Sequence, residues 1–346
     1  MQSLAVQYRP KDWDDLVEQS STRVILEQQL ANKTFKQAYL FVGPAGTGKT
    51  TSARIFANKI NNGKGNPIEI DAASHGNVDD IRELVNEAKL KPLEGDYKIF
   101  IIDECHCLSS AGWSAMLKLI EEPPATAIFI LATTDVQKVP KTIMSRCQRF
   151  DFQRISQKGI VNRLNYILDK ENFDGWDKDA VEYIAKQADG GMRDSLTLLD
   201  KCLAYDSYLS LQNVIKALGT VDYDVMFELT ENIFKGYQEQ VIKIIEDLHD
   251  QGKDLKLFIK NYIQFLLDLN KYWYGCDWQY LQIPELDEYK IKLDKNRKNW
   301  DNCLELLNTM VKLQSDIKYS NSPKYDLEVT LLLFINDEKI ILEGED

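Results

Sequence analysis

The chain has 346 residues, 44% of them hydrophobic and 10% aromatic, which excludes a disordered protein and allows two or three domains with sizeable cores. No apolar run approaches the roughly 18 residues that cross a bilayer, and no leader opens the chain, so we expect a cytoplasmic protein without a membrane partner. Most of the net charge of −12 comes from the C-terminal third of the chain, because residues 221–346 hold 15 basic against 25 acidic residues whereas residues 1–155 hold 19 of each. Any DNA contact must therefore come from local basic residues or helix N-termini within residues 1–155.

A glycine-rich segment at residues 43–50 completes the pattern G-x-x-x-x-G-K-[ST] after the apolar run 38–42 and before a helical pattern that starts at Thr51. Glycines allow a tight turn whose N–H groups point at phosphates, Lys49 would reach the outer phosphates, and Thr50 would hold Mg²⁺. The predicted loop comprises Gly43, Pro44, Ala45, Gly46, Thr47, Gly48, Lys49, Thr50 and Thr51. The flanking strand and helix favour a nucleoside triphosphate site over an ordinary glycine-rich turn.

The apolar run 98–102 is typical of a buried parallel strand, and Asp103 and Glu104 follow it directly. Ligands bind at this end of the strands in open α/β sheets. Asp103 would support Mg²⁺, whereas Glu104 would orient or deprotonate the attacking water, so the pair indicates hydrolysis and not binding alone. The alternative is that both carboxylates cap the next helix.

The segment Cys105-His106-Cys107 has the residue types of a metal cluster but no second C-x-x-C and no histidine at a usable spacing. We therefore predict ordinary packing beside the strand and no zinc. The six scattered cysteines indicate reduced thiols.

Further strands are predicted at 68–71 and 127–132, and the helix that ends at Pro123-Pro124 separates two of the strands, which indicates a parallel sheet covered by helices. After about Ser156 helical patterns dominate. Helices are predicted at 160–168, 178–188, 192–205, 225–234, 239–248, 255–274 and 300–317. Residues 284–299 look most like a loop, and the run 329–335, apolar on all faces, is predicted to be a core helix.

Several segments, taken together and in order, resemble the gamma/tau subunit of the bacterial replicative clamp loader, an AAA+ ATPase. They are residues 8–19, 68–74, 101–109, 117–124, 131–135 and Ser145-Arg146-Cys147. The resemblance covers most of residues 5–275. It implies an α/β P-loop AAA+ domain at 1–155, an all-α lid at 156–220 and an all-α collar at 221–346.

The same resemblance assigns site residues outside the glycine-rich loop. Those placed around the nucleotide are Tyr8, Arg9, Pro10, Thr133, Thr134 and Arg193. Thr133 or Thr134 would be sensor 1, near the γ-phosphate, and Arg193 would be sensor 2 on the lid. The alternative for Arg193 is lid packing or an ion pair with Asp194.

Arg146 would be an arginine finger that completes the site of a neighbouring subunit. A guanidinium brought to a γ-phosphate stabilises transition-state charge, so hydrolysis would depend on assembly. The alternative for an exposed arginine is a surface ion pair.

The chain departs from the family pattern in three places. Only residues 61–67 stand where the family usually inserts a four-cysteine zinc module, and Glu18 replaces a glycine. His75 and Asn77 replace basic residues, which leaves Arg82 as the matching contact for DNA phosphates.

The resemblance implies an ATPase subunit of a sliding-clamp loader that uses ATP and Mg²⁺. Its partners would be the other subunits of a ring, expected to be a pentamer, together with the sliding clamp and primer-template DNA. The chain resembles the short form, which suits a phage or a divergent replicon.

Two alternatives stay open at this stage. One is another AAA+ motor, for branch migration or helicase loading, against which Ser145-Arg146-Cys147 counts. The other is a catalytically silent scaffold in the same ring, against which the intact loop and Glu104 count.

Overall fold

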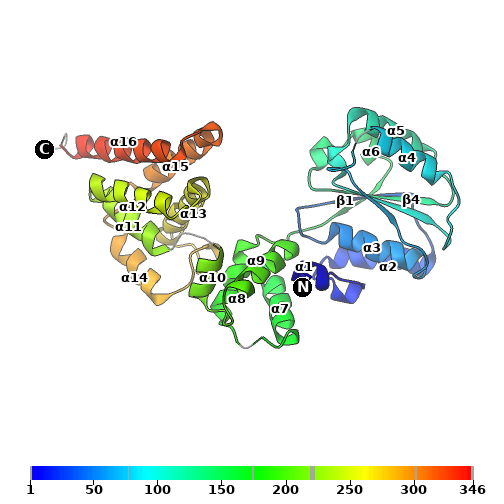
Figure 1. Ribbon diagram of the computed structural model, residues 1–346, viewed down its shortest axis with the longest axis horizontal. Helices are drawn as coiled ribbons and strands as arrows, with labels where there is room; N and C mark the ends of the chain where they lie inside the picture. Colours follow the sequence, from blue (N-terminus) through cyan, green and yellow to red (C-terminus); the bar gives the residue numbers. More distant parts are fainter. Residues whose placement is uncertain (1, 77, 174, 219–222, 301, 344–346) are drawn as a thin grey trace. The chain divides into compact units, whose positions relative to one another are not determined.

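A computed structural model describes residues 2–76, 78–173, 175–218, 223–300 and 302–343 (Figure 1). The chain divides into two compact units, which are described separately. Unit 1 comprises Met1–Phe173 and Ile184–Asp200, and unit 2 comprises Asp174–Tyr183 and Lys201–Asp346. The domain boundaries at 155 and 220 stay predictions; the second, like Asn77, lies outside the described residues.

Unit 1 contains a five-stranded parallel sheet in the order β2-β3-β4-β1-β5. The strands are β1 (Ala38–Val42), β2 (Ile68–Asp71), β3 (Lys98–Asp103), β4 (Ala127–Thr133) and β5 (Gln148–Asp151). Every residue of β1 and β4 is buried. A strand covered on both faces reads as a continuous apolar run, which is why the sequence revealed these strands.

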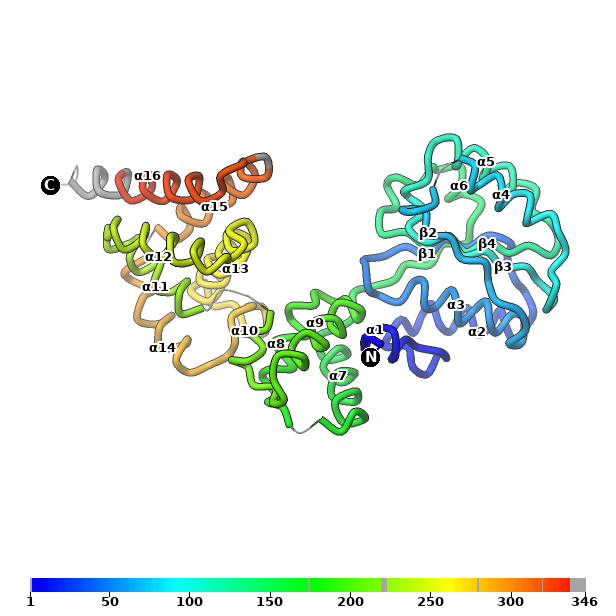
Figure 2. Tube along the Cα trace, viewed as in Figure 1, coloured from blue at the N-terminus to red at the C-terminus, as the bar shows by residue number. Residues whose placement is uncertain are grey.

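Helices cover both faces of the sheet (Figures 1 and 2). Those of the sheet region are α1 (Leu4–Gln7), α2 (Ser20–Asn32), α3 (Lys49–Ile60), α4 (Val78–Ala88), α5 (Ser110–Glu121) and α6 (Lys141–Met144), with short 3₁₀ turns at Trp13–Asp15, Cys105–Cys107 and Val136–Lys138. Leu40, Phe100 and Phe129 face a core shared with α4, α5 and α6. Tyr39 and Phe41 pack on the opposite face against α2 and α3. This alternation follows from the two-residue period of a strand.

The strand register brings the predicted site residues to one edge of the sheet. Val42 pairs with Thr133 across β1 and β4, and Ile102 pairs with Leu131 across β3 and β4. The loop after β1, the acids at the end of β3 and the threonines at the end of β4 therefore leave the sheet together. In the order β2-β3-β4-β1-β5, the chain runs from β1 to one side of the sheet and returns to β5 on the other side of β1. Open α/β sheets bind ligands at such a topological switch point.

The helices after the sheet are α7 (Gln157–Lys170), α8 (Lys178–Gln187) and α9 (Met192–Tyr205). The division into two units falls within α8 and within α9. Ser156 caps α7, since its hydroxyl accepts a hydrogen bond from the Gly159 N–H at 3.0 Å. Glu18, where the resembled family has glycine, adopts φ 59° and accepts the Ser156 N–H at 3.0 Å. The carboxylate thus ties the segment before α2 to the N-terminus of α7, where a negative charge is favourable.

Unit 2 is helical. Its elements are α10 (Leu211–Leu218), α11 (Tyr223–Phe234), α12 (Gln238–Asp250), α13 (Leu255–Trp273), α14 (Asp287–Asn296), α15 (Cys303–Asp316) and α16 (Pro323–Glu343), with 3₁₀ turns at Trp278–Tyr280 and Ile317–Tyr319. Helix α13 packs against α14, α15 and α16 and buries Phe258, Tyr262 and Phe265. The fold class predicted from the sequence, a P-loop α/β region followed by helices, is confirmed.

One sequence prediction in unit 2 is wrong, and another is confirmed for one face of a helix. The supposed loop 284–299 contains α14, because Tyr289 and Leu293 share one helical face and are buried, while most of the other residues of the helix are charged. The run 329–335 lies in helix α16, as predicted, and only one face of it is buried. Leu331 and Ile335 are buried, whereas Val329 and Leu333 are 55% and 58% exposed.

Within the ranges that the structure describes, no helix combines the length and apolarity needed to span a bilayer.

A buried carboxylate links α13 to the segment that follows Trp278–Tyr280. Asp268 has no exposed surface and accepts hydrogen bonds from the backbone N–H groups of Gln282 and Ile283 and from the Gln264 side chain. Burial raises the pKa of Asp268, and the donated hydrogen bonds act against that rise.

Replacing Asp268 with alanine should destabilise unit 2 by on the order of 2 kcal/mol, because the Gln282 and Ile283 N–H groups lose a buried acceptor. Urea denaturation followed by circular dichroism measures this change. The matched control is Asp250→Ala, at an exposed aspartate, which should move the midpoint little. Equal midpoints for the two variants would contradict the role given to Asp268.

Candidate nucleotide-binding site

The glycine-rich loop follows β1 and packs closely against the start of α9. Gly46 adopts φ +71°, and a Cβ at this position would lie 2.9 Å from the Cα of Gly191. The Met192 N–H also donates to the Gly46 carbonyl at 2.9 Å. Glycine is therefore required at position 46 both for its backbone conformation and for this close approach.

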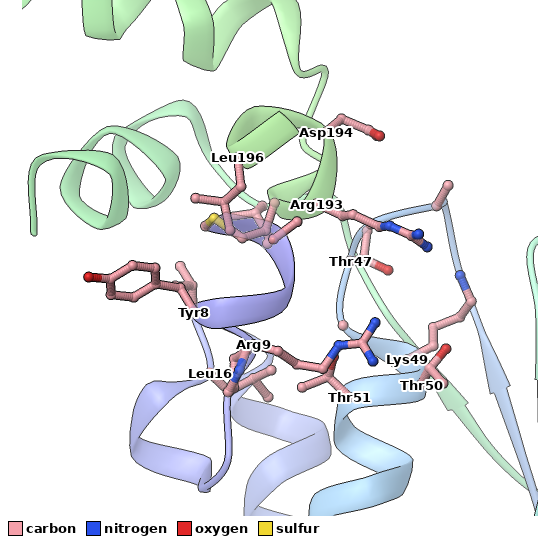
Figure 3. A pocket seen from close by; sticks show the side chains of 18 of the residues that line it. Tyr8, Arg9, Leu16, Thr47, Lys49, Thr50, Thr51, Arg193, Asp194 and Leu196 are labelled. Carbon is pink, nitrogen blue, oxygen red and sulfur yellow. The ribbon is translucent and has the colours of Figure 1, made fainter. Parts of the chain in front are cut away.

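A pocket of about 290 Å³ opens over this loop (Figure 3). Its lining residues are Ala5, Tyr8, Arg9, Pro10, Asp15, Leu16, Val17, Ala45, Gly46, Thr47, Gly48, Lys49, Thr50, Thr51, Asp103, Glu104, Ile155, Arg163, Met192, Arg193, Asp194 and Leu196. Most of the predicted nucleotide-binding residues are thus brought together. Gly43, Pro44, Thr133 and Thr134 are not among the lining residues. Gly43 and Pro44 accept hydrogen bonds from Lys49, and Thr134 donates to Glu104, both of which line the pocket. The Thr133 carbonyl accepts the Gly43 N–H at 3.2 Å.

Lys49 begins α3 and is only 5% exposed. Its Nζ donates hydrogen bonds to the carbonyls of Gly43 and Pro44, both at 2.8 Å. Burial lowers the pKa of Lys49, while Glu104 and Asp103 act in the opposite direction. A phosphate would give this largely desolvated cation a full counter-charge, which the two carbonyls do not supply.

The two predicted Mg²⁺ ligands lie within direct hydrogen-bond distance of each other. The Thr50 hydroxyl donates to Oδ2 of Asp103 at 2.6 Å, although 53 positions separate the two residues. A hydroxyl and a carboxylate beside the phosphate-binding loop are the oxygen ligands that Mg²⁺ prefers. The residues therefore fit the metal that the sequence predicts.

Glu104 lies at the end of β3 in a left-handed conformation, with φ 45°. Its Oε2 accepts a hydrogen bond from the Thr134 hydroxyl at 2.8 Å and lies 3.2 Å from Nδ1 of His106. The same His106 nitrogen is 3.1 Å from Oγ1 of buried Thr133. Both candidate sensor 1 threonines are thus connected to Glu104, Thr134 directly and Thr133 through His106.

Cationic side chains converge on the phosphate end of the pocket. Figure 3 shows Arg9 and Arg193 extending toward Lys49 and Thr50, while the Tyr8 ring points away. Burial and the nearby guanidinium groups of Arg54 and Arg193 lower the pKa of Arg9. This gathering of positive charge suits a polyanionic ligand.

Tyr8 lines the pocket, and it is held by α7 and by the residue that caps this helix, Glu171. Its hydroxyl donates to the Glu171 carboxylate, and burial together with this bond raises the pKa of Tyr8 to about 12. The Arg163 guanidinium donates to the Tyr8 carbonyl at 3.3 Å. The segment with Tyr8, Arg9 and Pro10, predicted to lie around the nucleotide, is therefore held by the first helix of the predicted lid.

Two predicted site residues lie away from the pocket. Arg146 forms an ion pair with Glu121 at 2.8 Å, and Arg82 pairs with Asp79 at 3.1 Å. Both arginines are exposed, by 40% and 69% of the side chain. Their assigned roles concern a neighbouring subunit and DNA, and those roles stay predictions.

The expected absence of zinc also stays a prediction. Across the described ranges, the acidic, histidine and cysteine side chains form no group of three that could hold a metal ion.

Sequence reasoning missed several lining residues, among them Leu16, Arg163, Met192 and Leu196. Met192 precedes Arg193 on α9, and Leu196 lies four residues after Met192, so helical spacing could have placed both on the pocket side. No sequence signal connects Arg163 with the loop.

Three family profiles match consecutive parts of the chain. They are described as the DNA polymerase III delta subunit (residues 66–156), the ATPase lid domain of the DNA polymerase III clamp loader subunit (159–207) and domain III of DNA polymerase III subunits gamma and tau (209–343). DNA polymerase III subunit gamma of Buchnera aphidicola from Acyrthosiphon pisum is 30% identical over 97% of this chain and 99% of its own length. The chain belongs to the gamma/tau family of clamp-loader subunits.

Other members of the gamma/tau family are longer. Subunit tau of Bacillus subtilis is 35% identical over 96% of this chain, which spans 62% of that protein. Subunit tau of Escherichia coli is 35% identical over 72% of this chain, which spans 42% of that protein. The chain thus corresponds to about half the length of these tau subunits.

Among solved structures, the RuvB Holliday junction branch migration motor of Thermotoga maritima is similar, with a TM-score of 0.52 and 19% identity. The similarity covers 71% of this chain and 86% of RuvB. At this identity it shows a shared fold, which agrees with the AAA+ architecture expected of a gamma/tau subunit.

Proposed function

We propose that this chain is an ATPase subunit of a sliding-clamp loader, which uses ATP binding and hydrolysis to open a ring clamp and load it onto primer-template DNA. The observation that carries the proposal is the convergence of Lys49, the Thr50–Asp103 pair and Glu104 at one edge of the sheet. Membership of the gamma/tau family supports the same function. We further propose that the protein is cytoplasmic and binds no zinc.

The polar residues at the phosphate end of the pocket have distinct tasks in this proposal. The backbone N–H groups of the loop and Lys49 would bind the phosphates, and Thr50 and Asp103 would hold Mg²⁺, which would supply neutralisation of the phosphate charge. Glu104 orients the attacking water and accepts its proton. Arg9 and Arg193 extend toward this end of the pocket and would add charge there.

The finger role of Arg146 belongs to the same proposal. The side chain lies outside the pocket of its own chain and is partly exposed, so it is accessible to an adjacent subunit. In a ring, expected to be a pentamer, Arg146 would reach the γ-phosphate of the neighbour and make hydrolysis depend on assembly.

Arg82 on α4 is the proposed contact with DNA phosphates. Asp79 and Asp80 occupy the first turn of the same helix, and Asp79 pairs with Arg82. A phosphate would therefore compete with a carboxylate for this guanidinium, so we expect a modest contribution from Arg82 alone.

Replacing Glu104 with glutamine should leave ATP binding intact and lower turnover by about a hundredfold or more, because glutamine preserves size and hydrogen bonding but cannot accept a proton. Equilibrium binding of a fluorescent ATP analogue and steady-state phosphate release measure the two effects. Loss of binding in this variant would show that Glu104 has a structural role.

Co-purification with a ring clamp tests the function as a whole. The assembled loader should retain the clamp with ATP and release it without ATP. Retention that does not depend on ATP would favour a silent scaffold. The absence of any clamp binding would favour another AAA+ motor, whose fold the RuvB similarity also allows.

A further inference from the structure

The guanidinium of Arg146 is held from two directions by groups of its own chain. Nη2 lies 2.8 Å from Oε1 of Glu121, and Nη1 donates to the Thr142 carbonyl at 2.8 Å. A longer contact of 3.4 Å joins Nη1 to the Ser145 hydroxyl. A carboxylate and a carbonyl on different nitrogens fix the plane of a guanidinium as well as its position.

The two members of this ion pair come from different helices. Glu121 is the last residue of α5, and Arg146 follows the C-cap of α6, which packs against α5. Both side chains are about two-fifths exposed, and an exposed pair of this kind adds little to folding stability. Its effect is therefore expected on the placement of Arg146 and not on the stability of the fold.

The number of N–H donors left on Arg146 shows whether Glu121 can stay bound when the guanidinium contacts a phosphate or would have to be displaced first. A guanidinium has five N–H groups, and the contacts that the structure describes occupy Nη1 and a single position on Nη2. Nε–H and a second Nη2–H are left for an incoming phosphate. Glu121 need not be displaced when Arg146 binds an anion.

We propose that Glu121 is a positioning residue for the finger, holding Arg146 oriented toward the γ-phosphate of the neighbouring subunit. The inference rests on the proposed function of Arg146. Because the guanidinium is held in place before assembly, less rotational freedom is lost when it meets the phosphate.

The test uses complete clamp-loader rings that contain this chain, with kcat and KM for ATP as readouts. Glu121→Ala should lower kcat by about tenfold, because a misplaced catalytic group loses most of its effect, while KM for ATP and ring assembly stay unchanged. Glu121→Gln keeps an acceptor oxygen and should lose less. Glu122→Ala, at the adjacent exposed carboxylate, is the matched control and should behave as the unmodified protein.

A double variant separates positioning from a general structural role. Adding Glu121→Ala to Arg146→Ala should cause no further loss of kcat, since Glu121 acts only through Arg146. A further loss in that background would overturn the inference, as would an unchanged or higher kcat in Glu121→Ala alone.

Failure of the proposed function gives a different result. If Arg146→Ala itself keeps full ring activity, the finger assignment is wrong and the role of Glu121 is wrong with it. If Arg146→Ala is inactive and Glu121→Ala is normal, only the inference about Glu121 is overturned.

Discussion

Replacing Lys49 with alanine should abolish ATP hydrolysis and weaken ATP binding. The glycine-rich motif assigns the Nζ to the β- and γ-phosphates, and the side chain is nearly buried beside the loop, where water screens its charge poorly. Its removal takes away charge that stabilises both the ground state and the transition state. Equilibrium ATP binding and steady-state phosphate release measure the two losses.

The control for this variant is Lys59→Ala on the same helix. Lys59 forms an ion pair with Asp12 at 2.9 Å at the other end of α3 and does not line the pocket. We expect that variant to hydrolyse ATP at the normal rate. Undiminished turnover in Lys49→Ala would contradict the assignment of the site.

Replacing Arg146 with alanine should leave ATP affinity in the isolated chain unchanged and remove most of the ATPase activity gained on assembly. The loss at sites that depend on the finger should be about 10³-fold or more, which is the effect of removing an arginine finger. ATP affinity should not change, because Arg146 does not line the pocket of its own chain. Binding to the isolated chain and hydrolysis by the ring separate these effects.

Mixed rings test whether Arg146 acts across the interface. A Lys49→Ala subunit still carries Arg146 and can complete an intact pocket next to it in a ring that also contains Arg146→Ala subunits. Mixed rings should therefore recover activity that neither variant shows alone. A lack of recovery in rings of confirmed assembly would indicate that Arg146 acts within its own subunit or only holds the ring together.

The sheet could be predicted largely from the sequence because its central strands are buried on both faces. Strand β1 matches its predicted range, and β3 and β4 each extend one residue further. Strand β5 was not predicted, because it is short, pairs only with β1 and buries a single residue, Phe150. The other edge strand, β2, was predicted because its sequence Ile-Glu-Ile-Asp alternates apolar and charged residues, whereas the Gln-Arg-Phe-Asp of β5 shows no such alternation.

The pocket was predictable to the extent that its residues belong to contiguous motifs. The glycine-rich loop and the Asp103-Glu104 pair follow from local patterns of loop, strand and charge. The Glu121–Arg146 pair could not be predicted, because α5 and α6 bring the two side chains together only in the folded chain. The ion-pair partner of an exposed charged residue depends on how the helices pack, which cannot be read from the neighbouring sequence.

The most direct test of the clamp-loader account is the ATPase rate of the assembled ring with and without its two macromolecular partners. We expect a sliding clamp and primer-template DNA, added together, to raise the rate well above that of the ring alone and to leave the clamp on the DNA. The same rate with and without both partners, with no clamp left on the DNA, would contradict the account.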